Sequence, residues 1–525
     1  MNIQASDAII ARSERRSGGT LRHALMTLAG AIALLWPAYL NGGPFWFPDS
    51  SNYVRAADAA VVYITGAPSE WSDRLKINNA TASEDTGSLA DGAAAVSAQP
   101  APVQPTRPVL AGRSIYYGFL LYLPMRFFGP WGSIFLQALL VAGILCYVGL
   151  RIQRIFQLST RTPVLWLVPV LLLASPLPFY TSMLMPDVYT GLLVLMLATL
   201  LCLWPHLLKG ERIALGLLCA TAATFHTTHL LITGGVGIAA LIFARERFAR
   251  WRAVTVSVAV IATGAASALA FNLGVAQALG QAPVSPPFLS ARITDAGPGT
   301  DYLRERCGRD GVDFVLCRYL ERLPAHSDAF LWDPNPQTAV YQILTDEERT
   351  RISMEDKRFF LAVMAYDPVA FVMACLRAFG AQLVDFDMEG FNPTASEVAE
   401  LEEKYPLSVA QAIRGTMAAS SAFPLTPVTW LTIATTIAAL AVLAFAWMRS
   451  RRDQTPDSAM VWSWAAIIIL GLLANAAVCG ALSGPHGRYQ MRVIWLLPLV
   501  AVTVATARGV TPVRESARMD GLAGR

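Results

Sequence analysis

Long apolar runs separated by short polar segments constrain this chain more than any other feature of its sequence. The runs lie at about 24–40, 131–150, 163–185, 188–206, 213–228, 230–244, 253–276, 425–447, 460–482 and 493–507. A helix needs about 20 mostly apolar residues to cross the hydrocarbon core of a bilayer. Hydrophobic residues make up 54% of the chain and charged residues 15%, which is more apolar surface than one soluble core can bury. We therefore expect an all-α polytopic membrane protein with about ten transmembrane helices.

Basic residues between the apolar runs indicate the orientation of these helices. Short Lys and Arg clusters lie in residues 1–20, after alternate runs, and from Arg508 onward. Loops rich in Lys and Arg stay in the cytoplasm, so we expect cytoplasmic tails at 1–20 and 508–525. Residues 21–276 then form a transmembrane module of seven spans, and 425–507 adds three more. The net charge of only +4, spread over such clusters, argues against nucleic-acid binding.

Two long polar segments fall on the outer side of this topology. Residues 42–130 form an outer loop, and within it 81–110 is rich in Ala, Ser, Pro and Gly, so we expect that part to be flexible. Residues 277–424 form an outer insert. Its two cysteines, Cys307 and Cys317, can close a disulfide in an oxidising compartment.

Two further stretches are apolar but interrupted. The first, 115–128, contains Pro124 and Arg126, and the second, 358–383, contains Asp367 and Pro368. Such a mixture is typical of helices that lie on the membrane surface or re-enter it. We expect interfacial helices at both places.

Two carboxylates stand where outer loops meet apolar runs. Asp49, in Phe47-Pro48-Asp49-Ser50, directly follows the first run, and Asp187, in Pro186-Asp187-Val188-Tyr189, lies between the third and fourth spans. A carboxylate at the water–lipid boundary can act as a general base. Each also follows a proline at the start of a helix, where it would serve as an N-cap. Both interpretations stay open, and at Asp49 they are compatible.

The loop between the last two spans is cationic although it lies on the outer side. Its segment Gly487-Arg488-Tyr489 is preceded by His486 and followed by Arg492. Short outer loops are usually poor in basic residues, so these side chains need an anionic partner. Arg forms forked, charge-assisted hydrogen bonds with phosphate. We expect a lipid phosphate there, with snorkelling to bilayer head groups as the alternative.

Other basic side chains share the outer side. His226 and His229, three residues apart between the fifth and sixth spans, suit a phosphate contact or interfacial packing better than a metal site, because no third ligand is evident. Arg113, just before the 115–128 stretch, joins the predicted phosphate-binding set. The sequence indicates no cofactor and leaves the use of a divalent metal ion open.

A carboxylate and a cationic loop on one face suit one reaction well. A sugar on a polyprenyl-phosphate carrier would be transferred to an acceptor hydroxyl, with the carboxylate taking the hydroxyl proton. Arg and His would stabilise the negative charge on the departing phosphate. One base and an in-line displacement predict inversion at the anomeric carbon.

This arrangement resembles the GT-C superfamily of membrane glycosyltransferases and, more loosely, bacterial lipid A and lipopolysaccharide core sugar transferases. The resemblance rests on the topology and on the short motifs around Asp49, Asp187 and Arg488. It implies a hexosyl- or pentosyltransferase of the bacterial inner membrane, with Asp49 and Asp187 catalytic and the site facing the periplasm. The donor would be a polyprenyl-phosphate-linked sugar, the acceptor a glycan, a lipid or a protein, and 277–424 a periplasmic insert.

Three other functions remain open. An O-antigen ligase-like enzyme would use the outer Arg and His residues and depend less on Asp49. A lipid or glycan flippase is a second alternative. The spans carry almost no ionisable residues near their middles, which argues against it. A noncatalytic assembly protein would use the 277–424 insert as its partner-binding module.

Overall fold

The computed structural model describes residues 21–67, 69–71, 113–244, 246–280, 282–309, 311–388, 390–451 and 456–511. Three predictions lie outside these residues: the 1–20 tail, the flexible 81–110 segment and all but the first residues of the 508–525 tail.

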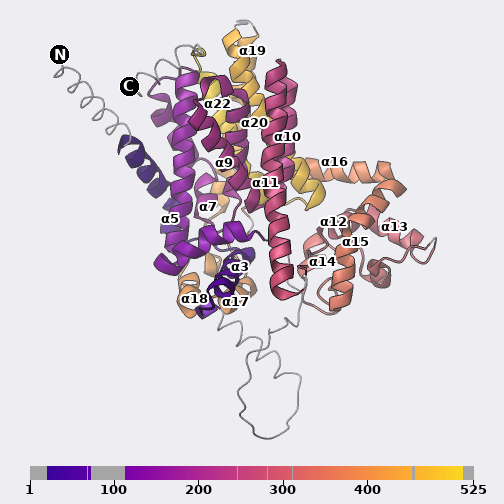
Figure 1. Ribbon diagram of the computed structural model, residues 1–525. Coiled ribbons are helices and arrows are strands. Elements are labelled where there is room, and N and C mark those ends of the chain that lie inside the picture. Colours follow the sequence, from indigo (N-terminus) through magenta and orange to yellow (C-terminus); the bar gives the residue numbers. More distant parts are fainter. Residues whose placement is uncertain are drawn as a thin grey trace, which may run out of the picture.

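Long helices build a bundle that fills the upper part of Figure 1. They are Leu21–Asn41, whose last part is α2 (Trp36–Asn41), α5 (Ile115–Ile155), α11 (Arg247–Leu279), α19 (Thr426–Ser450), α20 (Pro456–Leu482) and the consecutive pair α21 (Gly487–Ile494) and α22 (Leu496–Thr506). Shorter elements complete it: η1 (Pro163–Leu167), α6 (Val168–Leu173), α7 (Leu177–Ser182), α8 (Val188–Cys202), η2 (Trp204–His206), α9 (Lys209–Phe225) and α10 (Thr228–Phe243).

The number of membrane spans differs from the prediction. Among the described residues, six helices are long and apolar enough to cross a membrane, or seven if the bent pair formed by α15 (Asp346–Tyr366) and α16 (Pro368–Val384) is one span. The all-α class and the multi-pass membrane character hold, but the expectation of about ten spans is wrong.

Proline and helix length explain the difference. The predicted span 163–185 breaks into η1, α6 and α7, because proline lacks a backbone N–H and clashes with the preceding turn. The helices in three other predicted spans, α8, α9 and α10, have 15, 17 and 16 residues, fewer than the roughly 20 that a crossing needs. Almost all of α8 is buried against α9, α10 and α20, so its apolar residues fill the bundle core.

The predicted interfacial helices run roughly perpendicular to the long helices of the bundle. The first part of α5 does so up to Gly129, whose φ of 65° breaks the helix, and the rest of α5 runs along the bundle (Figure 1). The predicted surface helix over 358–383 is two helices, α15 and α16, and the chain bends by 111° between them. Like the first part of α5, α16 lies across the bundle, packs on α20, and leaves Val369, Val372 and Leu376 exposed.

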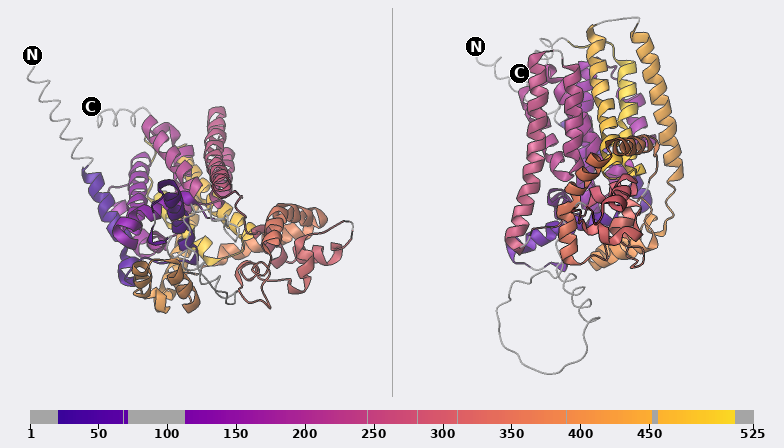
Figure 2. Two further views of the ribbon diagram at one scale, coloured as in Figure 1. Left: turned by 60° about the horizontal axis from the view of Figure 1, so that its bottom comes forward. Right: turned by 90° about the vertical axis from the view of Figure 1, so that its right-hand side faces the viewer.

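The segment predicted as one insert has two parts. Helices α12 (Phe288–Asp295), α13 (Pro298–Arg306), η3 (Val315–Arg322), α14 (Ser327–Trp332) and α15 enclose their own apolar core, and they stand to one side of the bundle (Figures 1 and 2). A disulfide joins Cys307 to Cys317 within this part. In contrast, α17 (Ala395–Lys404), α18 (Leu407–Arg414) and η4 (Ala418–Ser420) contribute residues to the main core.

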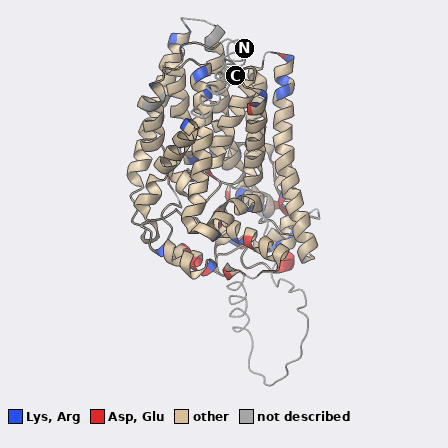
Figure 3. Cartoon of the chain, turned by 60° about the vertical axis from the view of Figure 1, so that its left-hand side comes forward, with Lys and Arg blue, Asp and Glu red and all other residues tan. Residues whose placement is uncertain are grey.

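One end of the bundle carries α3 (Pro48–Thr65) together with α17 and α18, and we refer to it as the α3 end. In Figure 3, charged residues of both signs lie at the α3 end of the bundle, and Lys and Arg predominate at the opposite end. α3 packs closely on α5, because Gly118 has no side chain and a Cβ there would collide with the Tyr53 carbonyl. This contact fixes the helix that carries Asp49.

Candidate functional site

Asp49 lies in the first turn of α3, which begins at Pro48 with Phe47 at the N-cap. The N-cap interpretation of Asp49 is therefore wrong. The Ser50 hydroxyl accepts from the Phe47 N–H (3.1 Å) and donates to the Leu184 carbonyl (2.9 Å), which ties the start of α3 to the segment before α8. The Asp49 carboxylate instead accepts a hydrogen bond from Arg113 Nη2 at 2.5 Å.

Asp187 and Arg492 form a second acid–base pair, and this one is buried. Arg492 Nη1 lies 3.0 Å from Asp187 Oδ1, and the two side chains are only 2% and 5% exposed. Asp187 occupies the N-cap position of α8, yet its carboxylate makes no capping hydrogen bond and is turned toward Arg492. The pair ties α8 to α21.

Asn475, a fully buried residue of α20, is part of this arrangement and is absent from the predicted set. Its side chain accepts from Arg492 Nη2 (3.0 Å) and donates to the Tyr489 carbonyl (2.8 Å). A single Asn within a long apolar helix was the signal in the sequence, because buried polar groups in such helices need specific partners.

Replacing Asp187 with alanine is expected to destabilise the protein by about 3–5 kcal/mol, because it leaves the Arg492 charge buried without its carboxylate. Thermal unfolding in detergent would show a clear drop in midpoint relative to the wild type. A Glu400→Ala variant, which loses an exposed pair with Lys404 on α17, is the control and should change the midpoint little. An Asp187→Ala midpoint close to that of the control would contradict the assigned role.

Arg488 lies between the two pairs and belongs to neither. Its guanidinium stacks on the Phe47 ring (4.3 Å to the centroid) and lies near the Tyr489 ring (4.9 Å). Nη2 donates to the Tyr489 hydroxyl at 3.2 Å. Nη1 is buried, and it has no acceptor in the part of the chain that the structure describes. The charges of Asp49 and Asp187 both act on this guanidinium, yet neither carboxylate forms an ion pair with it.

Asp49, Arg113, Asp187, Arg488, Tyr489 and Arg492 form one group, which we refer to as the cluster. Tyr53 lies beside this cluster. It is buried, and its ring packs edge-on against Tyr117 at 5.0 Å. Burial raises the pKa of the Tyr53 hydroxyl well above its ordinary value. Four charged side chains also act on it, namely Arg113, Asp49, Asp187 and Arg488. The carboxylates predicted from two loops and the arginines predicted from two others thus converge around one place.

The two predicted histidines between α9 and α10 differ. Burial lowers the pKa of His226 well below its ordinary value, and other charges act in the same direction: those of His229, Arg492, Arg113 and Arg488. The His226 side chain itself contacts the Thr228 hydroxyl through Nδ1 at 2.8 Å. His229 contacts Thr190 Oγ1 (2.9 Å) through Nε2 and the Ala222 carbonyl (2.6 Å) through Nδ1, so it links α8, α9 and α10 by packing.

His486 is turned toward the insert rather than toward Asp49. Its Nε2 lies 3.6 Å from Asp328 of α14, and its ring packs edge-on against Tyr489. Tyr489 itself belongs to the cluster through its contacts with Arg488 and Arg492. Of the predicted residues, Asp49, Arg113, Asp187, Arg488, Tyr489 and Arg492 meet at the cluster, whereas His226, His229 and His486 make other contacts.

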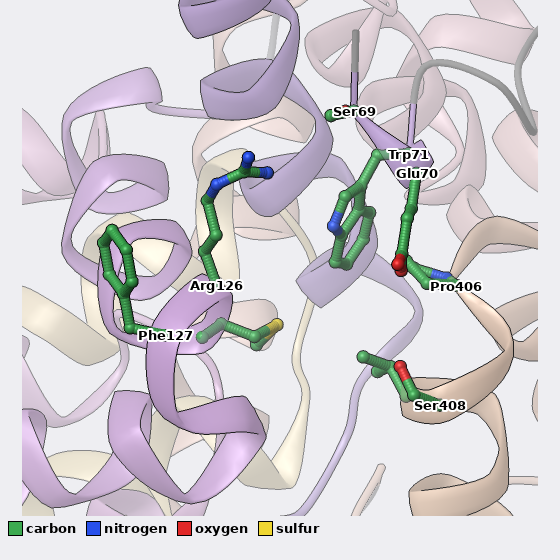
Figure 4. Close-up of a pocket in the computed structure, with 9 residues that line it drawn as sticks. Ser69, Glu70, Trp71, Arg126, Phe127, Pro406 and Ser408 are labelled. Carbon is green, nitrogen blue, oxygen red and sulfur yellow. The ribbon is translucent and has the colours of Figure 1, made fainter.

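A cavity of about 410 Å³ lies elsewhere at the α3 end, between the first part of α5, residues 69–71 and the start of α18 (Figure 4). Its polar lining comes from Ser69, Glu70, Arg126 and Ser408, and Trp71 forms one wall. None of the predicted site residues lines it. Ser69, which lines it, donates to the Asp58 carboxylate at 2.7 Å, so the cavity lies beside the middle of α3 rather than at Asp49.

Three or more His, Cys, Asp or Glu side chains grouped as metal ligands would be do not occur among the described residues. No protein-family model matches this chain, and no curated protein or solved structure matches it.

Proposed function

We propose that this chain is an inverting membrane glycosyltransferase that moves a sugar from a polyprenyl-phosphate donor to an acceptor hydroxyl. The unbalanced charge of Arg488 carries this proposal. Arg113 is paired with Asp49 and Arg492 with Asp187, which leaves Arg488 with a buried Nη1 and no ion-pair partner among the described residues. Arg488 is partly buried, and its buried Nη1 donor is left unsatisfied within the described part of the chain. An anion would satisfy that donor, and phosphate matches the forked donors of a guanidinium.

The two carboxylates take different roles in this proposal. Asp49 is 16% exposed and Asp187 only 5% exposed, so an acceptor hydroxyl reaches Asp49 more readily. Asp49 is the general base, and Asp187 fixes Arg492. Arg113 holds the Asp49 carboxylate in place until the acceptor hydroxyl takes its position as hydrogen-bond donor.

The reaction then follows from these positions. The acceptor oxygen attacks the anomeric carbon while its proton passes to Asp49. The bond between that carbon and the phosphate oxygen breaks, and the electron pair leaves with the lipid phosphate. Arg488 stabilises the charge that develops there, and Tyr489 supplies a further polar contact. Attack opposite to the leaving phosphate inverts the anomeric configuration.

The proposed setting is the bacterial inner membrane, with the site facing the periplasm and both termini in the cytoplasm. Two observations support it. Lys and Arg predominate at the end of the bundle opposite to α3 (Figure 3), as in cytoplasmic loops. The Cys307–Cys317 disulfide belongs to the insert, and disulfides persist in the periplasm.

A transfer assay in proteoliposomes tests the function. Purified protein would receive a polyprenyl phosphate carrying a labelled sugar together with an acceptor extract from bacterial envelopes. The proposal predicts labelled, inverted glycoside and free polyprenyl phosphate. Transfer of a whole preassembled glycan that survives Asp49→Asn would instead indicate a ligase. Movement of intact labelled lipid across the bilayer without a new glycosidic bond would indicate a flippase.

A further inference from the structure

The insert reaches the proposed phosphate-binding loop through Gln382, the last buried residue of α16. This side chain is fully buried. Its Nε2 donates to the His486 carbonyl at 2.8 Å, and its Oε1 accepts from the His486 N–H at 3.0 Å. One amide thus satisfies both backbone groups of a residue that lies two positions before Arg488.

Two further contacts bring the segment after α16 against the same site. Asp387 packs so closely on Gly487 that a Cβ at Gly487 would collide with the Asp387 backbone. Gly390, with φ of +83°, lies against the Phe47 ring, where a Cβ would also collide. Gly487 directly precedes Arg488, and Phe47 is the ring on which the Arg488 guanidinium stacks. Gln382, Asp387 and Gly390 therefore touch both sides of the Arg488 contact.

The loop that holds Arg488 needs such support. It follows α20 through Gly484, whose φ is +114°, and enters α21 at Gly487. Glycine leaves the backbone more conformational freedom than any other residue. A guanidinium binds phosphate tightly only when its geometry is already fixed, because ordering it on binding costs entropy.

We propose that Gln382 is a positioning residue, through which the insert holds the 484–488 loop so that Arg488 is stacked on Phe47 and ready for phosphate. This inference rests on the proposed function, since it assigns Arg488 to the donor phosphate. It gives the insert a role in donor binding that does not require the insert to touch the substrate.

A matched pair of glutamine variants tests the role. Gln382→Met keeps the side-chain volume and removes both hydrogen bonds to His486. Gln342→Met makes the same change within the insert, where the Gln342 amide donates to the Leu331 carbonyl of α14 and not to a backbone group of the 484–488 loop. Titration with polyprenyl phosphate should give about tenfold weaker binding to Gln382→Met and unchanged binding to Gln342→Met. Gln382→Glu, which still accepts from the His486 N–H, should bind with intermediate affinity.

Hydrogen exchange of the peptide that covers 484–492 gives a second, ligand-free measurement. Gln382→Met should speed exchange in this peptide, and Gln342→Met should not. Equal affinity of Gln382→Met and the wild type, at matched folded fractions, would overturn the positioning role while leaving the proposed function intact. So would unchanged exchange in the 484–492 peptide. Failure of the wild type to bind polyprenyl phosphate would instead overturn the proposed function, and the inference with it.

Discussion

Replacing Arg488 with alanine is expected to weaken polyprenyl-phosphate binding about 100-fold. A hydrogen bond to a charged group contributes roughly 1.5–3 kcal/mol, and 1.4 kcal/mol is a factor of ten in affinity. Alanine removes the charge together with the donors at Nη1 and Nη2. The fold should survive, because the Arg488 side chain makes one hydrogen bond, to Tyr489, among the described residues. Titration of purified variants with polyprenyl phosphate measures the effect.

Two further variants sharpen this test. Arg488→Lys keeps the charge but loses the planar fork and much of the stacking on Phe47, so its affinity should lie between those of the wild type and Arg488→Ala. Arg449→Ala removes an arginine at the end of α19 and should bind like the wild type. If Arg488→Ala and Arg449→Ala bound equally well, Arg488 would not be the phosphate contact.

Replacing Asp49 with asparagine is expected to lower kcat by about 10²–10⁴-fold, the usual contribution of a general base. Asparagine has nearly the same shape but does not take up the acceptor proton. Donor affinity should not fall, because the variant removes a negative charge beside Arg113 and leaves Arg488 untouched. The measurement is kcat from single-turnover transfer, alongside the dissociation constant for polyprenyl phosphate.

Asp187→Asn separates a catalytic carboxylate from a structural one. Asp187 is paired with Arg492 in the interior, so its loss should lower stability and leave the rate per folded molecule nearly unchanged. An Asp49→Asn variant with full kcat would remove Asp49 as the base. A rate loss at Asp187 that exceeded the loss at Asp49, at matched folded fractions, would reverse the two assignments.

Sequence patterns predicted the all-α membrane class because apolar run length is a local property. The number of spans was not predictable in the same way. Whether an apolar run such as 188–206 crosses a membrane or ends after 15 residues inside a bundle depends on what packs around it, and α8 is buried by three neighbouring helices.

Residue chemistry indicated most of the cluster but not its internal pairing. Arg113 and Asp49 are 64 residues apart, and Arg492 and Asp187 are 305 apart, so only the fold decides which arginine remains for a ligand. In the sequence, His229 looks no different from His226. The structure shows that it contacts Thr190, 39 residues away, and so links helices within the bundle. Asn475 and Gln382 stand out in the sequence because each is the only amide side chain in an apolar helix. The sequence did not identify the residues that they contact.

A density map of the protein with bound polyprenyl phosphate would show whether Arg488 holds the donor phosphate. We expect a phosphate oxygen within about 3 Å of Arg488 Nη1, a usual hydrogen-bond distance, with Asp49 on the side where an acceptor would approach. A phosphate bound away from Arg488, with Nη1 paired instead to a carboxylate of the chain, would contradict it.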